Sequence, residues 1–122
     1  MKQEEFFEWR GKANDRMFAA DPFFKQFNML DTVTYEGGLI PLKYKELTGL
    51  SLAIAARCDQ CIRHHLQKCI EAGANSGEMS EAVAIAVITA GSWSFPQARL
   101  AFELMVELGV ITESDVTTAL TP

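Results

Sequence analysis

The most informative stretch of the chain is residues 58–65, which read Cys58-Asp59-Gln60-Cys61-Ile62-Arg63-His64-His65. On a helix, positions i, i+3, i+4 and i+7 share one face. Cys58, Cys61 and His65 have this spacing, so their side chains should converge. Asp59 is a residue type favoured where helices begin, which places the cysteine pair at or near a helix start. The partial positive charge and unpaired N–H groups of a helix N-terminus lower the pKa of a thiol, as redox chemistry requires.

Composition indicates a single globular domain that binds neither nucleic acid nor membrane. The chain has 122 residues, of which 48% are hydrophobic and 22% charged. These values are ordinary for a soluble domain with one core. The formal net charge of −5 argues against a nucleic-acid or anionic-membrane surface, which needs clustered Lys and Arg.

The cysteine count and the N-terminus favour the cytoplasm. Three cysteines are an odd number, without the dense pairing of secreted mini-proteins, and this suggests a reducing compartment. The N-terminal residues Met-Lys-Gln-Glu-Glu lack the apolar core of a signal peptide. The longest apolar run, residues 82–91, is about half of the roughly 20 residues that a bilayer requires.

The spacing of apolar residues predicts an all-α fold of about six to seven helices. Strand-like alternation is absent and the loops are short, so we expect one domain over residues 1–122. The helix that ends at Ala90 is nearly all apolar, which is typical of a helix in a core or an oligomer interface. The expected helices cover residues 2–19, 22–35, 42–56, 58–72, 76–90 or, with Ser80 as its cap, 82–90, then 96–108, and a short last segment that begins at 112–115.

The Cys58–Cys61 spacing suits either a local disulfide or a metal site. His65, one turn after Cys61, could take its proton or stabilise its thiolate. Glu46 lies twelve residues before Cys58, so spacing alone does not bring it to the thiols. It would reach His65 if the third and fourth helices pack antiparallel; otherwise it is an exposed helix glutamate.

The other candidates have simpler interpretations. His64 points elsewhere on the helix and is interpreted as structural or exposed. Cys69 is expected to behave as a small buried hydrophobe. Trp93 and Phe95, with the Phe-rich second helix, could line a pocket for an organic substrate, but such aromatics more often belong to a core or a subunit interface.

With Glu46, Cys58, Cys61 and His65 at these intervals, the chain resembles the alkylhydroperoxidase D-like (AhpD-like) branch of the carboxymuconolactone decarboxylase superfamily. The resemblance covers about residues 40–108 and continues through Ala72-Gly73 and residues 78–82. It implies a helical bundle that assembles into homo-trimers or homo-hexamers. It also implies a thiol-dependent reductase of hydroperoxides or small disulfides, without flavin, haem or metal.

The resemblance also implies roles for the four residues. Glu46 and His65 would form a proton relay that deprotonates Cys61, which attacks the peroxide. Cys58 would resolve the sulfenic acid to a disulfide, and an external dithiol would reduce it. The helix-terminus argument instead favours Cys58 as the more acidic thiol. Relatives often carry His or Tyr where this chain has Gln60, so one relay member is missing here.

Three alternatives stay open at this stage. Glu46, Cys58, Cys61 and His65 could be the four ligands of a structural zinc. The chain could instead be a lyase with the decarboxylation activity that names the family. That activity belongs to a branch without the cysteine pair, and a lyase reaction has no use for thiols at redox spacing. Finally, the motif could be vestigial on an oligomeric scaffold or binding subunit.

Overall fold

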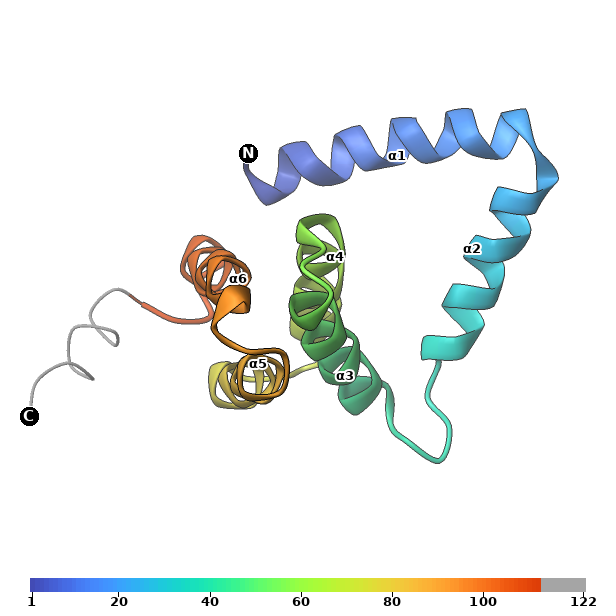
Figure 1. The fold of residues 1–122 in the computed structure, drawn as a ribbon. Coiled ribbons are helices and arrows are strands. Elements are labelled where there is room, and N and C mark those ends of the chain that lie inside the picture. The colour runs from blue at the N-terminus through green and yellow to red at the C-terminus, as the bar shows by residue number, and fades with distance from the viewer. Residues whose placement is uncertain (113–122) are drawn as a thin grey trace, which may run out of the picture. The chain divides into compact units, whose positions relative to one another are not determined.

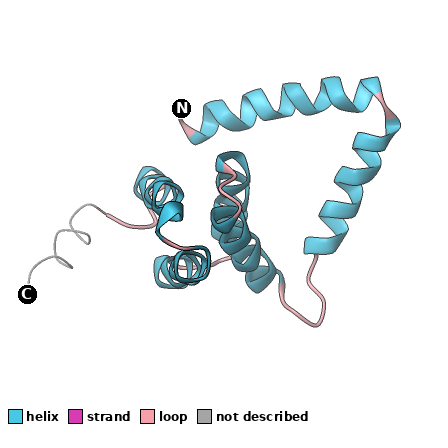
Figure 2. Ribbon diagram, viewed as in Figure 1, coloured by secondary structure: helices cyan, strands magenta, loops and turns pink. Residues whose placement is uncertain are grey.

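The computed structural model describes residues 1–112, and within these residues the chain is all-α (Figures 1 and 2). This confirms the fold class predicted from the sequence. One short 3-10 helix, η1, precedes the last α-helix. The elements are α1 (Gln3–Ala20), α2 (Pro22–Tyr35), α3 (Leu42–Ala55), α4 (Asp59–Glu71), α5 (Ser76–Ala90), η1 (Ser92–Ser94) and α6 (Phe95–Glu107).

Capping residues set several helix ends. The Asp21 side chain accepts a hydrogen bond from the Phe23 N–H and caps α2, as its type predicts. The sequence left two possible starts for α5. A capping box, in which Asn75 and Glu78 each accept from the other's backbone N–H, fixes the earlier start at Ser76. Gly73 ends the cysteine-bearing helix at a φ of 86°, a left-handed conformation that favours glycine.

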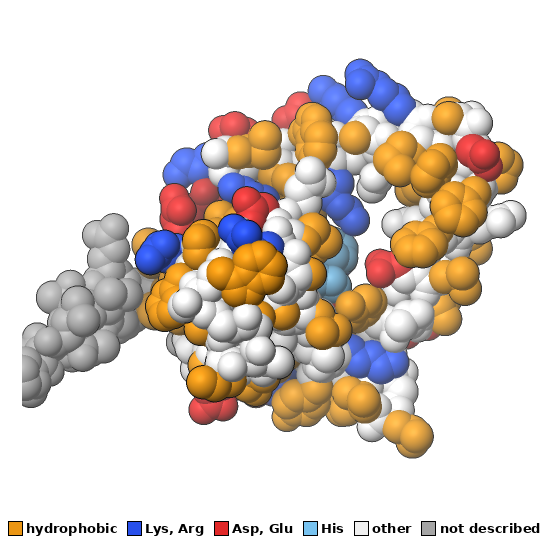
Figure 3. Space-filling view, in the orientation of Figure 1, with side chains coloured by type: hydrophobic (Ala, Val, Ile, Leu, Met, Phe, Trp, Pro, Cys, Tyr) orange, Lys and Arg blue, Asp and Glu red, His pale blue; other side chains and the backbone are white. Residues whose placement is uncertain are grey.

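The chain divides into two compact units, and the first comprises residues 1–36. Within it, α1 and α2 contact each other. No residue of α2 is buried, and its apolar stripe of Phe23, Phe27, Leu30 and Val33 is exposed. Hydrophobic side chains accordingly lie at the surface along α2 in Figure 3. The predicted helix is correct, and its apolar face is exposed among the residues that the structure describes.

The second unit begins at residue 37 and contains a four-helix arrangement with the main core. Helix α3 packs on α4 and α5, and α6 packs on the same two helices, so the four helices enclose one apolar interior. The largest fully buried side chains of this interior are Leu50, Ile54, Ile62, Leu66, Met79, Leu104 and Met105.

Helix α5 has apolar residues on both its faces. Met79 and Val83 are buried in the core, whereas Ile85 and Ile88 are 61% and 85% exposed. The sequence predicted a core or an oligomer interface for this helix. The buried face confirms the predicted core position. Self-association through the exposed face stays a prediction.

Among the described residues, no helix is long and apolar enough to cross a membrane. The short last helix expected from residue 112 falls almost wholly outside the described residues. The single domain over residues 1–122 stays a prediction.

Candidate functional site

The turn between α3 and α4 positions the cysteine pair. Arg57 adopts a left-handed φ of 56°, which redirects the chain after α3. Cys58 follows as the N-cap of α4, and its backbone N–H donates to the Ala53 carbonyl at 3.0 Å. The prediction that the pair lies at a helix start is therefore confirmed.

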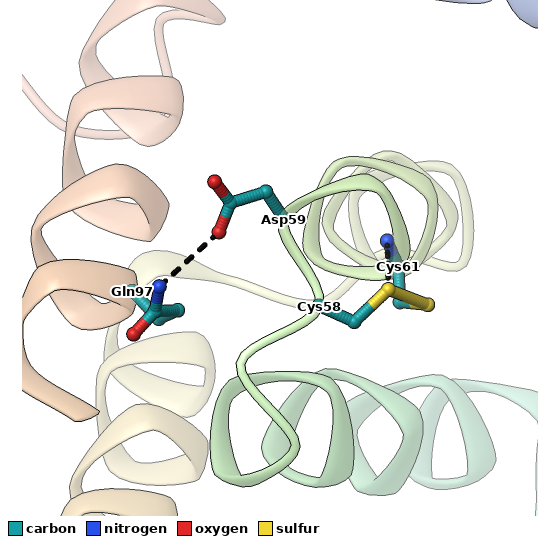
Figure 4. The surroundings of a disulfide bond; sticks show 4 residues. All are labelled: Cys58, Asp59, Cys61 and Gln97. Carbon is teal, nitrogen blue, oxygen red and sulfur yellow. Dashed lines mark hydrogen bonds between the residues drawn. A yellow bond between two sulfur atoms is a disulfide. The ribbon is translucent and has the colours of Figure 1, made fainter. Parts of the chain in front are cut away.

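Cys58 and Cys61 form a disulfide across the first turn of α4, with their Cα atoms 5.2 Å apart (Figure 4). The Cys61 backbone N–H donates to Cys58 Sγ at 3.2 Å, so this sulfur serves as the capping acceptor of the helix. Cys58 is half-buried and Cys61 is exposed. Of the two residues, Cys61 is the more accessible to a molecule in solution.

His65, one helical turn after Cys61 in α4, belongs to a buried pair of titratable groups. His65 Nδ1 and Glu46 Oε1 are 2.9 Å apart, and the two residues are 9% and 4% exposed. A carboxylate can only accept, so we assign Nδ1 as the donor of this bond and Nε2 as the ring nitrogen without a hydrogen. Helical side chains lean toward the N-terminus, and His65 therefore leans toward the turn that holds Cys61.

The pairing settles the question that the sequence left open for Glu46. Glu46 lies in the first half of α3 and His65 in the middle of α4, as expected for an antiparallel helical hairpin. The interpretation of Glu46 as an exposed helix glutamate is wrong. Three-turn spacing could not reveal this, because the contact crosses between two helices.

Gly49 makes room for the imidazole and was missed by the sequence analysis. A Cβ at this position would lie 2.6 Å from His65 Nδ1 and 2.8 Å from Cε1, closer than real Cβ contacts. Only glycine therefore lets the His65 ring stand against α3 and meet Glu46. The sequence could have indicated this role. A glycine inside a helix destabilises the helix by about 1 kcal/mol relative to alanine, so its presence there suggests a packing or functional reason.

Other candidate residues lie around this site. The half-buried His64 ring packs edge-on against the His65 ring, with centroids 4.9 Å apart. Cys69 is fully buried, as predicted, and burial, followed by the charges of Glu46 and Glu78, raises the pKa of its thiol to about 12. Cys69 therefore stays protonated and unreactive.

The aromatic residues after α5 do not belong to a core. Trp93 and Phe95 are 58% and 49% exposed. The Arg57 guanidinium lies over the Trp93 ring, 4.7 Å from its centroid. Within residues 1–112, no three His, Cys, Asp or Glu side chains are grouped so as to hold a metal ion.

Fold and site together define a small helical thiol protein with a Cys-x-x-Cys disulfide backed by a buried His–Glu pair. The sequence model of the carboxymuconolactone decarboxylase family matches residues 21–104. The chain belongs to this family, as the resemblance of its motif indicated. A search of curated proteins found no match.

Solved structures of the family share the fold. Two crystal structures of the Thermotoga maritima protein TM1620 are 37% and 38% identical to the chain, with TM-scores of 0.83 and 0.81. They cover 86% and 85% of this chain, which in turn covers 93% and 89% of theirs. TM1620 is described as a family member "possibly involved in antioxidative response". An apo family protein from Legionella pneumophila, lpg0406, is 25% identical with a TM-score of 0.79, covering 86% of this chain and 95% of its own.

Proposed function

We propose that the chain is a thiol-dependent reductase of hydroperoxides or small disulfides, in the AhpD-like branch of its family. The observation that carries the proposal is the buried Glu46–His65 pair, one helical turn from the Cys58–Cys61 disulfide. A structural disulfide needs no proton acceptor behind it, whereas a dithiol that turns over does. The antioxidative description of TM1620 supports the same chemistry.

The first step oxidises one thiol. His65 Nε2 accepts the Cys61 proton, and the resulting imidazolium is stabilised by the Glu46 carboxylate. The Cys61 thiolate attacks a hydroperoxide oxygen, so an S–O bond forms as the O–O bond breaks. The alkoxide leaves and takes the proton from His65, which yields an alcohol and Cys61 sulfenic acid.

The second step closes the disulfide. The Cys58 thiol gives up its proton as its sulfur attacks the Cys61 sulfur. An S–S bond forms, the S–O bond breaks, and the departing hydroxide takes up that proton and leaves as water. The two electrons that reduce the peroxide thus come from the two sulfurs. An external dithiol, in a reducing compartment such as the cytoplasm, then restores both thiols by exchange.

Exposure supports Cys61 as the attacking residue. It is the more exposed cysteine and lies one turn from His65, while Cys58 Sγ is held at the helix cap by the Cys61 N–H. The same capping bond stabilises a Cys58 thiolate, which suits the resolving role. Gln60 is exposed beside them and cannot transfer a proton, so His65 is the single base of this relay.

Steady-state peroxide consumption tests the proposal, with cumene hydroperoxide as oxidant and dithiothreitol as reductant. Cys61→Ser and Cys58→Ser should each abolish turnover, and Glu46→Gln should lower it by about 100-fold, the low end of what a proton relay contributes. Cys69→Ala is the matched control and should keep wild-type turnover. Wild-type turnover by Cys61→Ser would refute the assignment, and no thiol-dependent turnover with peroxide or with a small disulfide would refute the function.

A further inference from the structure

We propose that Gln97 is a positioning residue for the redox pair. It lies on α6, almost forty residues from the cysteines, and it holds the 57–59 turn so that Cys58 is placed to close the disulfide with Cys61. The importance of this role for turnover rests on the proposed function. The geometric role itself does not depend on which oxidant the protein uses.

The Gln97 amide joins the two residues that flank Cys58. Its Oε1 accepts from Arg57 Nε at 3.0 Å, and its Nε2 donates to Asp59 Oδ1 at 3.3 Å. The carbonyl oxygen therefore faces the cation and the amino group faces the anion, which is the one orientation that satisfies both partners. Gln97 is 8% exposed, and both hydrogen bonds are partly buried, although Arg57 and Asp59 are themselves exposed.

Gln97 does not touch the sulfur atoms. In Figure 4 the Gln97 amide and the disulfide lie on opposite sides of the backbone at Cys58 and Asp59. Its effect on the thiols must pass through the backbone of the turn. It is thus a positioning residue and takes no part in bond making.

The turn needs to be held because its backbone is disfavoured. Arg57 has a φ of 56°, a region in which a side chain with a Cβ is uncommon. Two backbone hydrogen bonds close the turn, from the Arg57 N–H to the Ile54 carbonyl and from the Cys58 N–H to the Ala53 carbonyl, each at 3.0 Å. The Gln97 oxygen and the Trp93 ring, which lies beside the guanidinium, additionally hold the Arg57 side chain. Trp93 is itself fixed, since its Nε1–H donates to the Ala90 carbonyl at 2.8 Å.

The consequence differs between the two redox states. In the oxidised protein, the disulfide itself restrains Cys58. In the reduced protein no covalent bond does so, and the turn relaxes when Gln97 is lost. Closing the disulfide must then order the turn again, so the disulfide becomes less stable relative to the dithiol.

The test measures the equilibrium between the protein dithiol plus oxidised glutathione and the protein disulfide plus two reduced glutathione molecules, with no peroxide present. Gln97→Met keeps the side-chain length and removes both hydrogen bonds. We expect its equilibrium constant to be about fivefold below wild type, the factor that corresponds to about one net hydrogen bond. The matched control is Gln67→Met, a half-buried glutamine of α4, which should match wild type. A Gln97→Met constant within twofold of the control would overturn the proposal.

A second pair of variants acts at an exposed position, where folding is not at risk. Asp59→Asn keeps an oxygen acceptor for Gln97, whereas Asp59→Ala does not, and both remove the charge. The alanine variant should have the lower constant, and equal constants would contradict the proposal. If the protein proves inactive toward peroxides and disulfides while Gln97→Met still lowers the constant, the proposed function fails and the positioning role stands.

Discussion

Gly49→Ala is predicted to break the Glu46–His65 pair from inside the helix. The new Cβ would meet the His65 ring at 2.6–3.0 Å, and the ring must turn away from α3. The 2.9 Å hydrogen bond is then lost and the Glu46 carboxylate stays buried without it. A hydrogen bond to a charged group contributes about 1.5–3 kcal/mol, so the free energy of unfolding should fall by this amount after correction for helix propensity.

Gly11→Ala supplies that correction. Gly11 also lies inside a helix, and a Cβ there meets nothing within 4 Å. Both variants gain about 1 kcal/mol of helix propensity, so their difference reports the effect on His65 alone. Urea denaturation of the reduced proteins measures stability, and peroxide consumption measures activity, which should fall about 100-fold in Gly49→Ala and stay unchanged in Gly11→Ala.

A double-mutant cycle identifies the mechanism. If Gly49→Ala acts by breaking the relay, adding Glu46→Gln should lower activity little further, because the pair is already lost. Multiplied losses in the double variant would mean that the two residues act independently. Stability and activity equal to those of Gly11→Ala would refute the reasoning.

Three further predictions concern other parts of the chain. The Asn75 N–H, then the Lys43 ammonium, holds the pKa of Glu78 below its ordinary 4.5. Glu78→Gln should therefore lower the free energy of unfolding above pH 4.5, and this difference should disappear as the pH falls through the lowered pKa. Acid titrations of the stability of both proteins measure it. Cys69, with a thiol pKa near 12, should resist iodoacetamide at pH 8 in the folded reduced protein, and its labelling alongside the other two cysteines would contradict this. Wild type should sediment as a trimer or hexamer and Ile88→Glu as smaller species; a wild-type monomer at micromolar concentration would exclude self-association.

Local chemistry made much of the fold predictable. The Asp21 cap, the Gly73 stop and the cysteine pair at a helix start follow from residue types whose preferences act within one or two turns. Apolar spacing gave the helices themselves. The same spacing predicted the apolar stripe of α2 but could not predict that the stripe is exposed, because periodicity identifies an apolar face without indicating what covers it.

The site was harder to predict because its decisive contacts cross between helices. The spacing of Cys58, Cys61 and His65 needs one helix, whereas Glu46 meets His65 only through the packing of α3 on α4. Gly49 left a local signal as a glycine inside a helix. The sequence around Gln97 contains no such signal, because nothing in it relates this residue to a turn almost forty residues away.

The central claim is that hydroperoxide oxidises Cys58 and Cys61 as a pair. The most direct measurement is the intact mass of the reduced protein before and after one equivalent of an organic hydroperoxide, followed by peptide mapping of the cysteines. The account predicts the loss of two hydrogen atoms, localised to a Cys58–Cys61 disulfide, with Cys69 unchanged. A protein whose thiols remain reduced, or whose oxidation falls on Cys69, would contradict it.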